Sequence, residues 1–173
     1  MARTVARMAA EILEHDGDEV MLVGIHTRGV PLAGRLARAL EEATGTKISV
    51  GRLDISLYRD DVGPWRPAHQ QPVLKETVLP DSIDGRVIYL IDDVLFTGRT
   101  TLAAMNELMA WGRPSQIHLC VLVDRGGREL PVHADVVGRL VETLEENQTV
   151  EVLVPELDGR LGVDLVHMHP ESK

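Results

Sequence analysis

Aromatic residues are scarce in this chain, where tryptophan, tyrosine and phenylalanine together make up 3% of the sequence. Stacking of bases on aromatic rings is therefore not available as a general way to bind single-stranded nucleic acid. An excess of positive charge is also absent, because 27 acidic residues against 18 lysines and arginines give a net charge of −9. The sequence argues against broad nucleic-acid affinity, so any RNA contact would need a local basic patch.

Cysteine and long apolar runs are equally sparse. The single cysteine, Cys120, cannot form an internal disulfide and lies in the apolar run HLCVLV, so we expect a buried thiol and not a nucleophile. No apolar stretch approaches the ~20 residues of a membrane span, and the N-terminus lacks the uninterrupted apolar core of a signal peptide. We expect a cytoplasmic protein without membrane contact, folded as a single domain over residues 1–173.

The most informative stretch is VIYLIDDVLFTGRTT, residues 87–101. Its apolar beginning, Val87 to Ile91, is typical of a strand buried on both faces of a parallel sheet. Asp92 and Asp93 follow at the carboxyl end, where open α/β sheets bind ligands. The next turn leads into a helix, so backbone N–H groups and hydroxyls can converge on an anion. Its residues are Thr97, Gly98, Arg99, Thr100 and Thr101.

Two further loops follow predicted buried strands. Thr27 and Arg28 come after the strand at 20–25, and the loop 124–131 comes after the strand at 117–123. A structural turn with a solvated arginine is the alternative interpretation of the first loop. Because parallel strands end at one edge of a sheet, all three loops are expected to meet there. A phosphorylated ribose that carries pyrophosphate needs this set of groups, with Mg²⁺ held mainly by substrate oxygens.

Hydrophobic patterning gives the fold class. Alternating helical and strand patterns are typical of an α/β, doubly wound, mainly parallel sheet flanked by helices. Helices are expected at residues 5–13, 32–43 and 102–111, and strands at 20–25, 48–58, 87–91, 117–123, 133–137, 150–154 and 159–169. The core-facing residues of the third helix are expected to be Leu102, Met105, Leu108 and Met109.

The segment at residues 59–80 is not assigned to a helix or a strand. Residues 59–80 carry four prolines and many charges, and a connection of this length predicts a lid or an extended hairpin. His167 and His169 share a strand face but have no third ligand in the sequence, so no metal site of protein side chains is predicted. No role is assigned to His15, His69 and His118.

These motifs resemble a known family. The stretch at residues 87–101 resembles the phosphoribosylpyrophosphate signature of the type I phosphoribosyltransferases. The segments LVGIHTRGVPLA, ISVGRLDISLYRDD and GRPSQIHLCVLVDRGGRELP are similar to the pyrimidine operon regulators, the PyrR family. The resemblance implies a small hood over the base and a homodimer or higher oligomer. It also implies two activities: formation of UMP and pyrophosphate from uracil and phosphoribosylpyrophosphate, and UMP- or UTP-dependent binding of pyrimidine-operon leader RNA.

The resemblance also implies roles for particular residues. Asp92 and Asp93 would contact ribose, residues 97–101 the 5-phosphate, and Thr27 with Arg28 the pyrophosphate. Arg59 would approach pyrophosphate from the base of the lid. Phe96 stands where purine-using relatives often place an acid, which favours a pyrimidine and leaves the general base unassigned. Uracil would be selected, largely through backbone groups, by the hood residues Val123, Asp124 and Arg125.

Departures from the family pattern concern RNA. RNA-binding relatives usually carry other residues at four positions, which here are Ala6, Ala10, Gly127 and His133, and the segment LVETLEENQ after Arg139 is acidic. The remaining candidate RNA contacts are Arg7, Arg125, Arg128 and Arg139. The sequence leaves open a bifunctional protein, an RNA-binding nucleotide sensor with little transferase activity, and a transferase without RNA regulation. A purine or orotate transferase is a fourth possibility.

Overall fold

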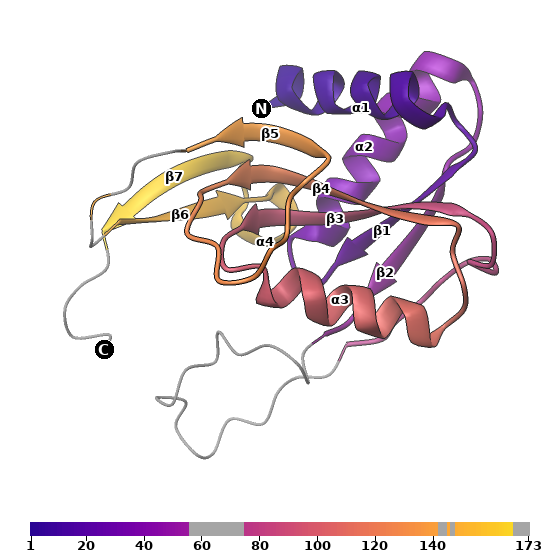
Figure 1. Ribbon diagram of the computed structural model, residues 1–173. Coiled ribbons are helices and arrows are strands. Elements are labelled where there is room, and N and C mark those ends of the chain that lie inside the picture. The colour runs from indigo at the N-terminus through magenta and orange to yellow at the C-terminus, as the bar shows by residue number, and fades with distance from the viewer. Residues whose placement is uncertain (56–74, 142–144, 146–147, 168–173) are drawn as a thin grey trace.

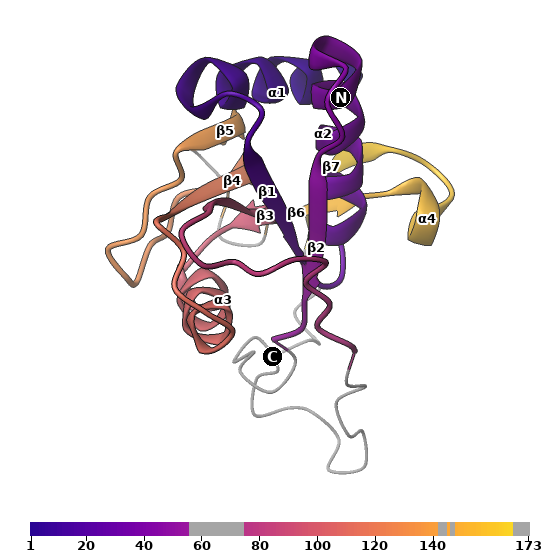
Figure 2. The same ribbon diagram turned by 90° about the vertical axis from the view of Figure 1, so that its right-hand side faces the viewer.

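A five-stranded parallel sheet forms the centre of the computed structural model, which describes residues 1–55, 75–141, 145 and 148–167. Its strand order is β2-β1-β3-β4-β5, and every neighbouring pair is parallel. The strands are β1 (Val20–Ile25), β2 (Ser49–Leu53), β3 (Val87–Leu95), β4 (Gln116–Asp124) and β5 (Val136–Leu140). The predicted doubly wound architecture is confirmed, because helices cover both faces of this sheet (Figure 1; Figure 2).

Two helices cover one face. In α1 (Ala2–Asp16) the buried residues Val5, Met8 and Ile12 recur at helical spacing and pack against the sheet. The helix ends as predicted at Gly17, whose φ of 74° favours glycine and whose N–H bonds to the carbonyl of Leu13. On the same face lies α2 (Gly29–Thr44), which packs in the same apolar cluster.

The helix α2 begins three residues earlier than predicted. Pro31 lies in its first turn, where an N–H donor is not needed, so it does not delay the helix. Gly29 packs so closely on β3 that a Cβ there would lie 2.3 Å from the carbonyl oxygen of Ile91. The first turn of α2 therefore sits directly against the strand that carries Asp92.

The structure differs from the prediction of which residues of the third helix face the core. α3 (Arg99–Ala110) buries Thr101, Ala104 and Leu108 against the opposite face of the sheet. Leu102 and Met109, which were predicted to face the core, are 45% and 53% exposed. The sheet-facing stripe follows positions 101, 104 and 108, so each of these two residues lies one position, about 100°, away from it. Of the four predicted core residues, Leu108 is buried and Met105 is partly buried.

Strand boundaries also differ from the predictions. β3 continues to Leu95, because pairing with β4 extends through Leu95 and Asp124. Asp92 and Asp93 therefore lie within the last part of the strand and not after it. β2 is shorter than the expected 48–58, and β5 begins at Val136, after His133.

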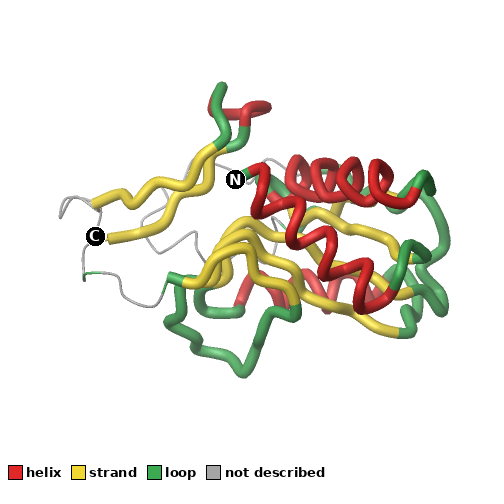
Figure 3. The backbone as a smooth tube through the Cα atoms, turned by 90° about the horizontal axis from the view of Figure 1, so that it is seen from above, coloured by secondary structure: helices red, strands yellow, loops and turns green. Residues whose placement is uncertain are grey.

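A separate hairpin completes the described chain. β6 (Gln148–Leu153) pairs antiparallel with β7 (Gly162–His167), and the short α4 (Pro155–Asp158) connects them. Figure 3 shows this hairpin beside the carboxyl ends of the central strands. The contacts that fasten it to the rest of the chain include those from Arg125 to Thr149 and from Arg28 to Asp158.

Cys120 is fully buried on β4, as predicted, and burial raises the pKa of its thiol well above the usual range. Among the helices of the described ranges, none has the length and apolarity needed to cross a membrane. Most of the predicted lid lies outside the described residues. The same holds for Arg59, His69 and His169.

Candidate functional site

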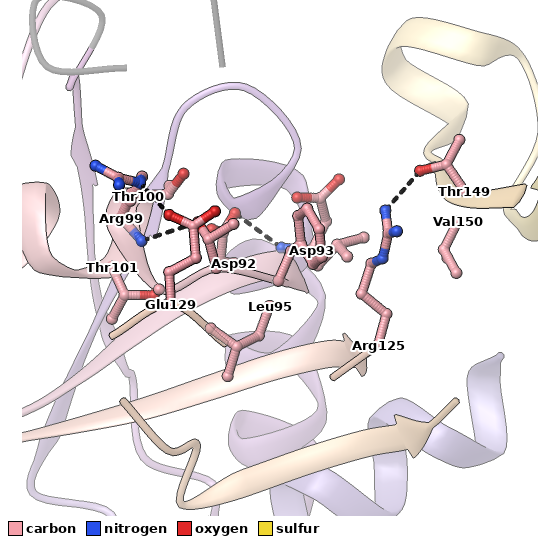
Figure 4. A pocket seen from close by; sticks show the side chains of 14 residues that line it. Asp92, Asp93, Leu95, Arg99, Thr100, Thr101, Arg125, Glu129, Thr149 and Val150 are labelled. Atoms are coloured by element: carbon pink, nitrogen blue, oxygen red, sulfur yellow. Dashed lines mark hydrogen bonds and ion pairs between the residues drawn. The ribbon is translucent and has the colours of Figure 1, made fainter. Parts of the chain in front are cut away.

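A cavity of about 650 Å³ opens at the carboxyl end of β3 (Figure 4). Its walls come from the end of β3, the turn at 96–98, the start of α3, the loop after β4 and the strand β6. In the chain order of the sheet, β1 leads outward to β2 while β3 leads the other way to β4 and β5. The cavity thus lies beside the switch point between β1 and β3, the usual ligand crevice of open α/β sheets.

Asp92 and Asp93 lie at the centre of this cavity. Both line it, and the N–H of Asp93 donates to the carboxylate of Asp92 over 2.9 Å. Asp92 is buried, with 7% of its surface exposed, whereas Asp93 is half-buried. The structure therefore presents two carboxylates of different exposure at the place where the sequence predicted a sugar site.

The predicted anion turn forms the adjacent wall. Gly98 has a φ of 91°, and α3 starts at the next residue, so the N–H groups of the first helical turn lie at this wall. The N–H of Arg99 donates to the hydroxyl of Thr97 over 3.3 Å. The Arg99 side chain itself donates to Glu129 over 2.7 Å. All five residues from 97 to 101 line the cavity.

The loop after β1 leads into Gly29, which packs on β3 at Ile91 and Asp92, but the loop does not itself line the cavity. The ammonium group of Lys75 donates to the Thr27 hydroxyl over 2.7 Å. The guanidinium of Arg28 pairs with Asp158 at 3.1 Å and with Glu151 at 3.6 Å. Its Nε is buried and has no hydrogen-bond partner among the described residues. Cations from two segments therefore meet at the loop after β1, where Asp158 and Glu151 balance the charge of Arg28.

Of the three predicted hood residues, only Arg125 lines the cavity. Its guanidinium lies 4.0 Å from the centre of the Phe96 ring and donates to the Thr149 hydroxyl over 2.8 Å. Val123 is fully buried in the core. Asp124 is buried enough to oppose ionisation, but hydrogen bonds from Arg128 and from the N–H of Gly126 outweigh this and lower the pKa of its carboxyl.

Sequence reasoning missed four residues at or near the cavity. Lys75 and Glu129 occur in segments that were recognised as loops, but nothing in their local pattern indicated which side chain would turn inward. Thr149 and Val150 come from β6, which was predicted only as a short strand. Their place depends on how the hairpin folds back over the sheet, which local periodicity does not encode.

The candidate RNA-contacting arginines mostly make internal contacts. Arg7 pairs with Glu11 and donates to the carbonyls of Val137 and Gly138. Arg128 pairs with Asp124 and donates to several loop carbonyls, and Arg125 faces the cavity. Arg139 is exposed on β5.

The parallel sheet, the acid pair and the adjoining anion turn are the marks of a phosphoribosyltransferase. The phosphoribosyl transferase domain family matches residues 1–157. Hypoxanthine phosphoribosyltransferases from Trypanosoma cruzi and Staphylococcus aureus share the fold, with TM-scores of 0.68 and 0.64 at 18% identity. These alignments cover 98% and 100% of this chain, and 87% and 92% of the two structures.

Closer relatives define the branch. A protein of Herpetosiphon aurantiacus is 52% identical over 159 residues, which cover 91% of this chain and 86% of the relative. One of Thermus thermophilus is 49% identical over 167 residues, which cover 95% and 90%. Both carry the name bifunctional protein PyrR. The chain belongs to the PyrR family.

Proposed function

We propose that this chain transfers the phosphoribosyl group of phosphoribosylpyrophosphate to uracil, forming UMP and releasing pyrophosphate. The observation that carries the proposal is the acid pair at the end of β3, which adjoins both the threonine-rich turn at the start of α3 and the cationic loop after β1. A phosphorylated ribose that carries pyrophosphate fits two hydroxyl-binding carboxylates with one anion site in the same cavity and a second on the adjoining loop.

Each group has a task in this reaction. Asp92 and Asp93 accept hydrogen bonds from the ribose hydroxyls and stabilise the positive charge that develops at the anomeric carbon. The backbone N–H groups and hydroxyls of residues 97–101 hold the 5-phosphate. Thr27 and Arg28 bind pyrophosphate, with Lys75 as a further cation beside them. Arg59, proposed for the same group, lies outside the described residues.

The bond changes are simple. The bond from the anomeric carbon to the pyrophosphate oxygen breaks, and a bond to a ring nitrogen of uracil forms as that nitrogen loses its proton to solvent or to the released pyrophosphate. Phe96 has no group that can accept this proton, so it is not the general base. Its apolar ring and the Arg125 guanidinium above it form the wall where we place the pyrimidine.

Phosphoribosyltransferases of this fold generally use Mg²⁺ together with phosphoribosylpyrophosphate. The cavity suits that ion, because Asp92 and Asp93 supply the hard oxygen donors that Mg²⁺ prefers. In our proposal substrate oxygens would hold most of the ion, which would supply charge neutralisation for the departing pyrophosphate. Asp92 and Asp93 orient the ribose beside it.

The family membership favours a second function, UMP- or UTP-dependent binding of the pyrimidine-operon leader RNA. This function would belong to a homodimer or higher oligomer in the cytoplasm, built from one domain per chain. The arginines that would contact RNA are Arg7, Arg125, Arg128 and Arg139. The first three already make internal contacts, so the RNA face must rely on few additional cations.

The transferase is tested by measuring UMP formation from uracil, phosphoribosylpyrophosphate and Mg²⁺. We expect Asp92→Asn and Asp93→Asn each to lower kcat/KM by about 10²-fold or more, the scale at which loss of one electrostatic group acts. Glu42→Gln, an exposed change on α2, serves as the matched control and should leave the rate unchanged. Wild-type turnover of hypoxanthine or orotate in preference to uracil would overturn the choice of base, and no turnover of any base would overturn the reaction.

A further inference from the structure

A second cluster of titratable side chains lies at the opposite edge of the sheet. α1 ends at Asp16, four residues before β1 begins, and the first residue of β1 pairs with Val87 at the start of β3. The end of α1 is therefore at the amino edge of the parallel strands, away from the cavity at their carboxyl ends (Figure 1).

Three side chains with metal-binding atoms converge there. His15 and Asp16 come from the end of α1, and His118 comes from the start of β4. Nδ1 of His15 lies 2.9 Å from Oδ2 of Asp16, and Nε2 of His118 lies 3.5 Å from the same oxygen. One potential ligand atom from each residue lies within 4.8 Å of both others.

Two further residues hold this cluster in place. The Tyr89 hydroxyl donates to Oδ2 of Asp16 over 2.6 Å, and its ring stacks on His118 with 5.0 Å between ring centres. Nδ1 of His118 lies 3.2 Å from a carboxylate oxygen of Asp135. A carboxylate that orients the far nitrogen of a histidine, and a hydrogen bond to a liganding carboxylate, are the supports that metal ligands usually receive.

The electrostatics of the cluster call for a cation. Three oxygen atoms face the ring nitrogens of His118: a carboxylate oxygen of Asp135 lies 3.2 Å from Nδ1, while Oε1 of Gln116 and Oδ2 of Asp16 lie 3.1 Å and 3.5 Å from Nε2. A neutral imidazole has one N–H, so when Nδ1 donates to Asp135, the lone pair of Nε2 faces the oxygens of Gln116 and Asp16. The contact of Nε2 with Asp16 then becomes favourable only with a cation between the two atoms, which is either a second proton or a metal ion. Burial of Asp16 opposes its ionisation, but the Tyr89 hydroxyl and the His15 imidazole outweigh that effect and lower the pKa of its carboxyl.

We propose that His15, Asp16 and His118 form a site for a divalent transition metal ion of the zinc type, independent of the transferase cavity. Two imidazoles and a carboxylate suit zinc better than magnesium or calcium. In a tetrahedral zinc site with bonds of about 2.0–2.1 Å, neighbouring donors lie roughly 3.3 Å apart. The distances of 2.9 and 3.5 Å bracket that value.

The site has a closed side and an open side. The side chains of Asp16 and His118 are each 14% exposed, whereas that of His15 is 60% exposed. Solvent can therefore deliver the ion past His15 and supply water as the fourth ligand. A bound ion would join the last turn of α1 to β4, so its effect is to fasten this helix to the sheet.

The test uses the full chain without a histidine tag, stripped with EDTA and titrated with ZnCl₂ against a chromophoric chelator. We expect one tight zinc equivalent per chain. His15→Ala and Asp16→Asn should each weaken binding at least about tenfold, a change of about 1.4 kcal/mol. His167→Ala is the matched control, because this histidine is exposed on β7 and outside the cluster.

Cobalt provides a second measurement on the same proteins. Bound Co²⁺ should give the visible absorption of a tetrahedral site in wild type and in His167→Ala, and lose it in His15→Ala. His15 is the better variant to rely on, since its exposed side chain can be removed without opening the core. Absence of a tight zinc equivalent in wild type, unchanged binding in His15→Ala, or equal loss in His167→Ala would overturn the proposal. The cluster would then be a proton-held ion pair.

Discussion

Gly127 lies against the Phe96 ring, in the loop after β4. Its φ of 74° is in the left-handed region, and a Cβ there would meet a ring carbon of Phe96 at 2.4 Å. Position 127 is one of the four at which the sequence was expected to depart from RNA-binding relatives, and glycine here also meets a local steric requirement. A larger residue must either displace the ring or move the loop.

Gly127→Ala should therefore have two effects. It should destabilise the protein by about 1–2 kcal/mol, because a left-handed backbone disfavours any Cβ, and it should weaken UMP binding by pushing Phe96 out of the cavity wall. Thermal denaturation and calorimetric titration with UMP measure these two effects.

Gly126 provides the control for that experiment. It has a φ of 68°, but a Cβ at this position would have no neighbouring atom within 4 Å, so Gly126→Ala carries the backbone penalty without the clash. UMP affinity should stay at the wild-type value in this variant. Equal UMP affinity in both alanine variants would contradict the role given to the Phe96 ring.

Among the elements, α3 offers the sharpest test of how the layers pack. Leu108 is fully buried, while Leu102 on the same helix is 45% exposed. Leu108→Ala should lower the free energy of unfolding by about 2–5 kcal/mol, the usual loss for a buried leucine. Leu102→Ala should change it by no more than about 0.5 kcal/mol. Urea titration of both variants measures these changes in the free energy of unfolding. A comparable decrease in both variants would mean that Leu102 is covered in solution.

The helices and strands also show which features of the fold can be predicted from local sequence patterns. The all-buried strand β1 and the glycine stop of α1 were predicted correctly, because apolar runs and Gly17 act locally. The buried face of α3 was not predicted correctly. The apolar residues of this helix can form either of two apolar stripes, and only contact with the sheet determines which of them is buried. The same limit applies to the site: its acid pair and its threonine turn could be predicted from one segment. Lys75 and Thr149 could not be predicted as part of the site, because they come from segments far away in the sequence and local patterns carry no information on how such segments meet.

At the scale of the whole molecule, the negative net charge limits the affinity for RNA. The chain has a net charge of −9, and three of the four candidate RNA arginines are engaged internally. Few phosphate contacts remain, so affinity for leader RNA should depend only weakly on salt.

Filter binding of the native leader transcript at several salt concentrations, with and without UMP, tests this expectation. Arg139→Ala should reduce the slope of log affinity against log salt by about one unit. Arg38→Ala, which removes an exposed arginine on α2, is the matched control and should leave the slope unchanged. Identical slopes in the two variants, or binding that UMP does not change, would count against RNA regulation by this surface.

The wall formed by Phe96 has a practical consequence for spectroscopy. Phe96 is the only phenylalanine in the chain, and its ring lies under Arg125 at the cavity. Incorporating fluorinated phenylalanine would thus label one position, and the ¹⁹F NMR spectrum would contain a single protein resonance. Its shift on addition of uracil or UMP would report occupancy of the cavity directly, in a protein whose sequence is otherwise unaltered.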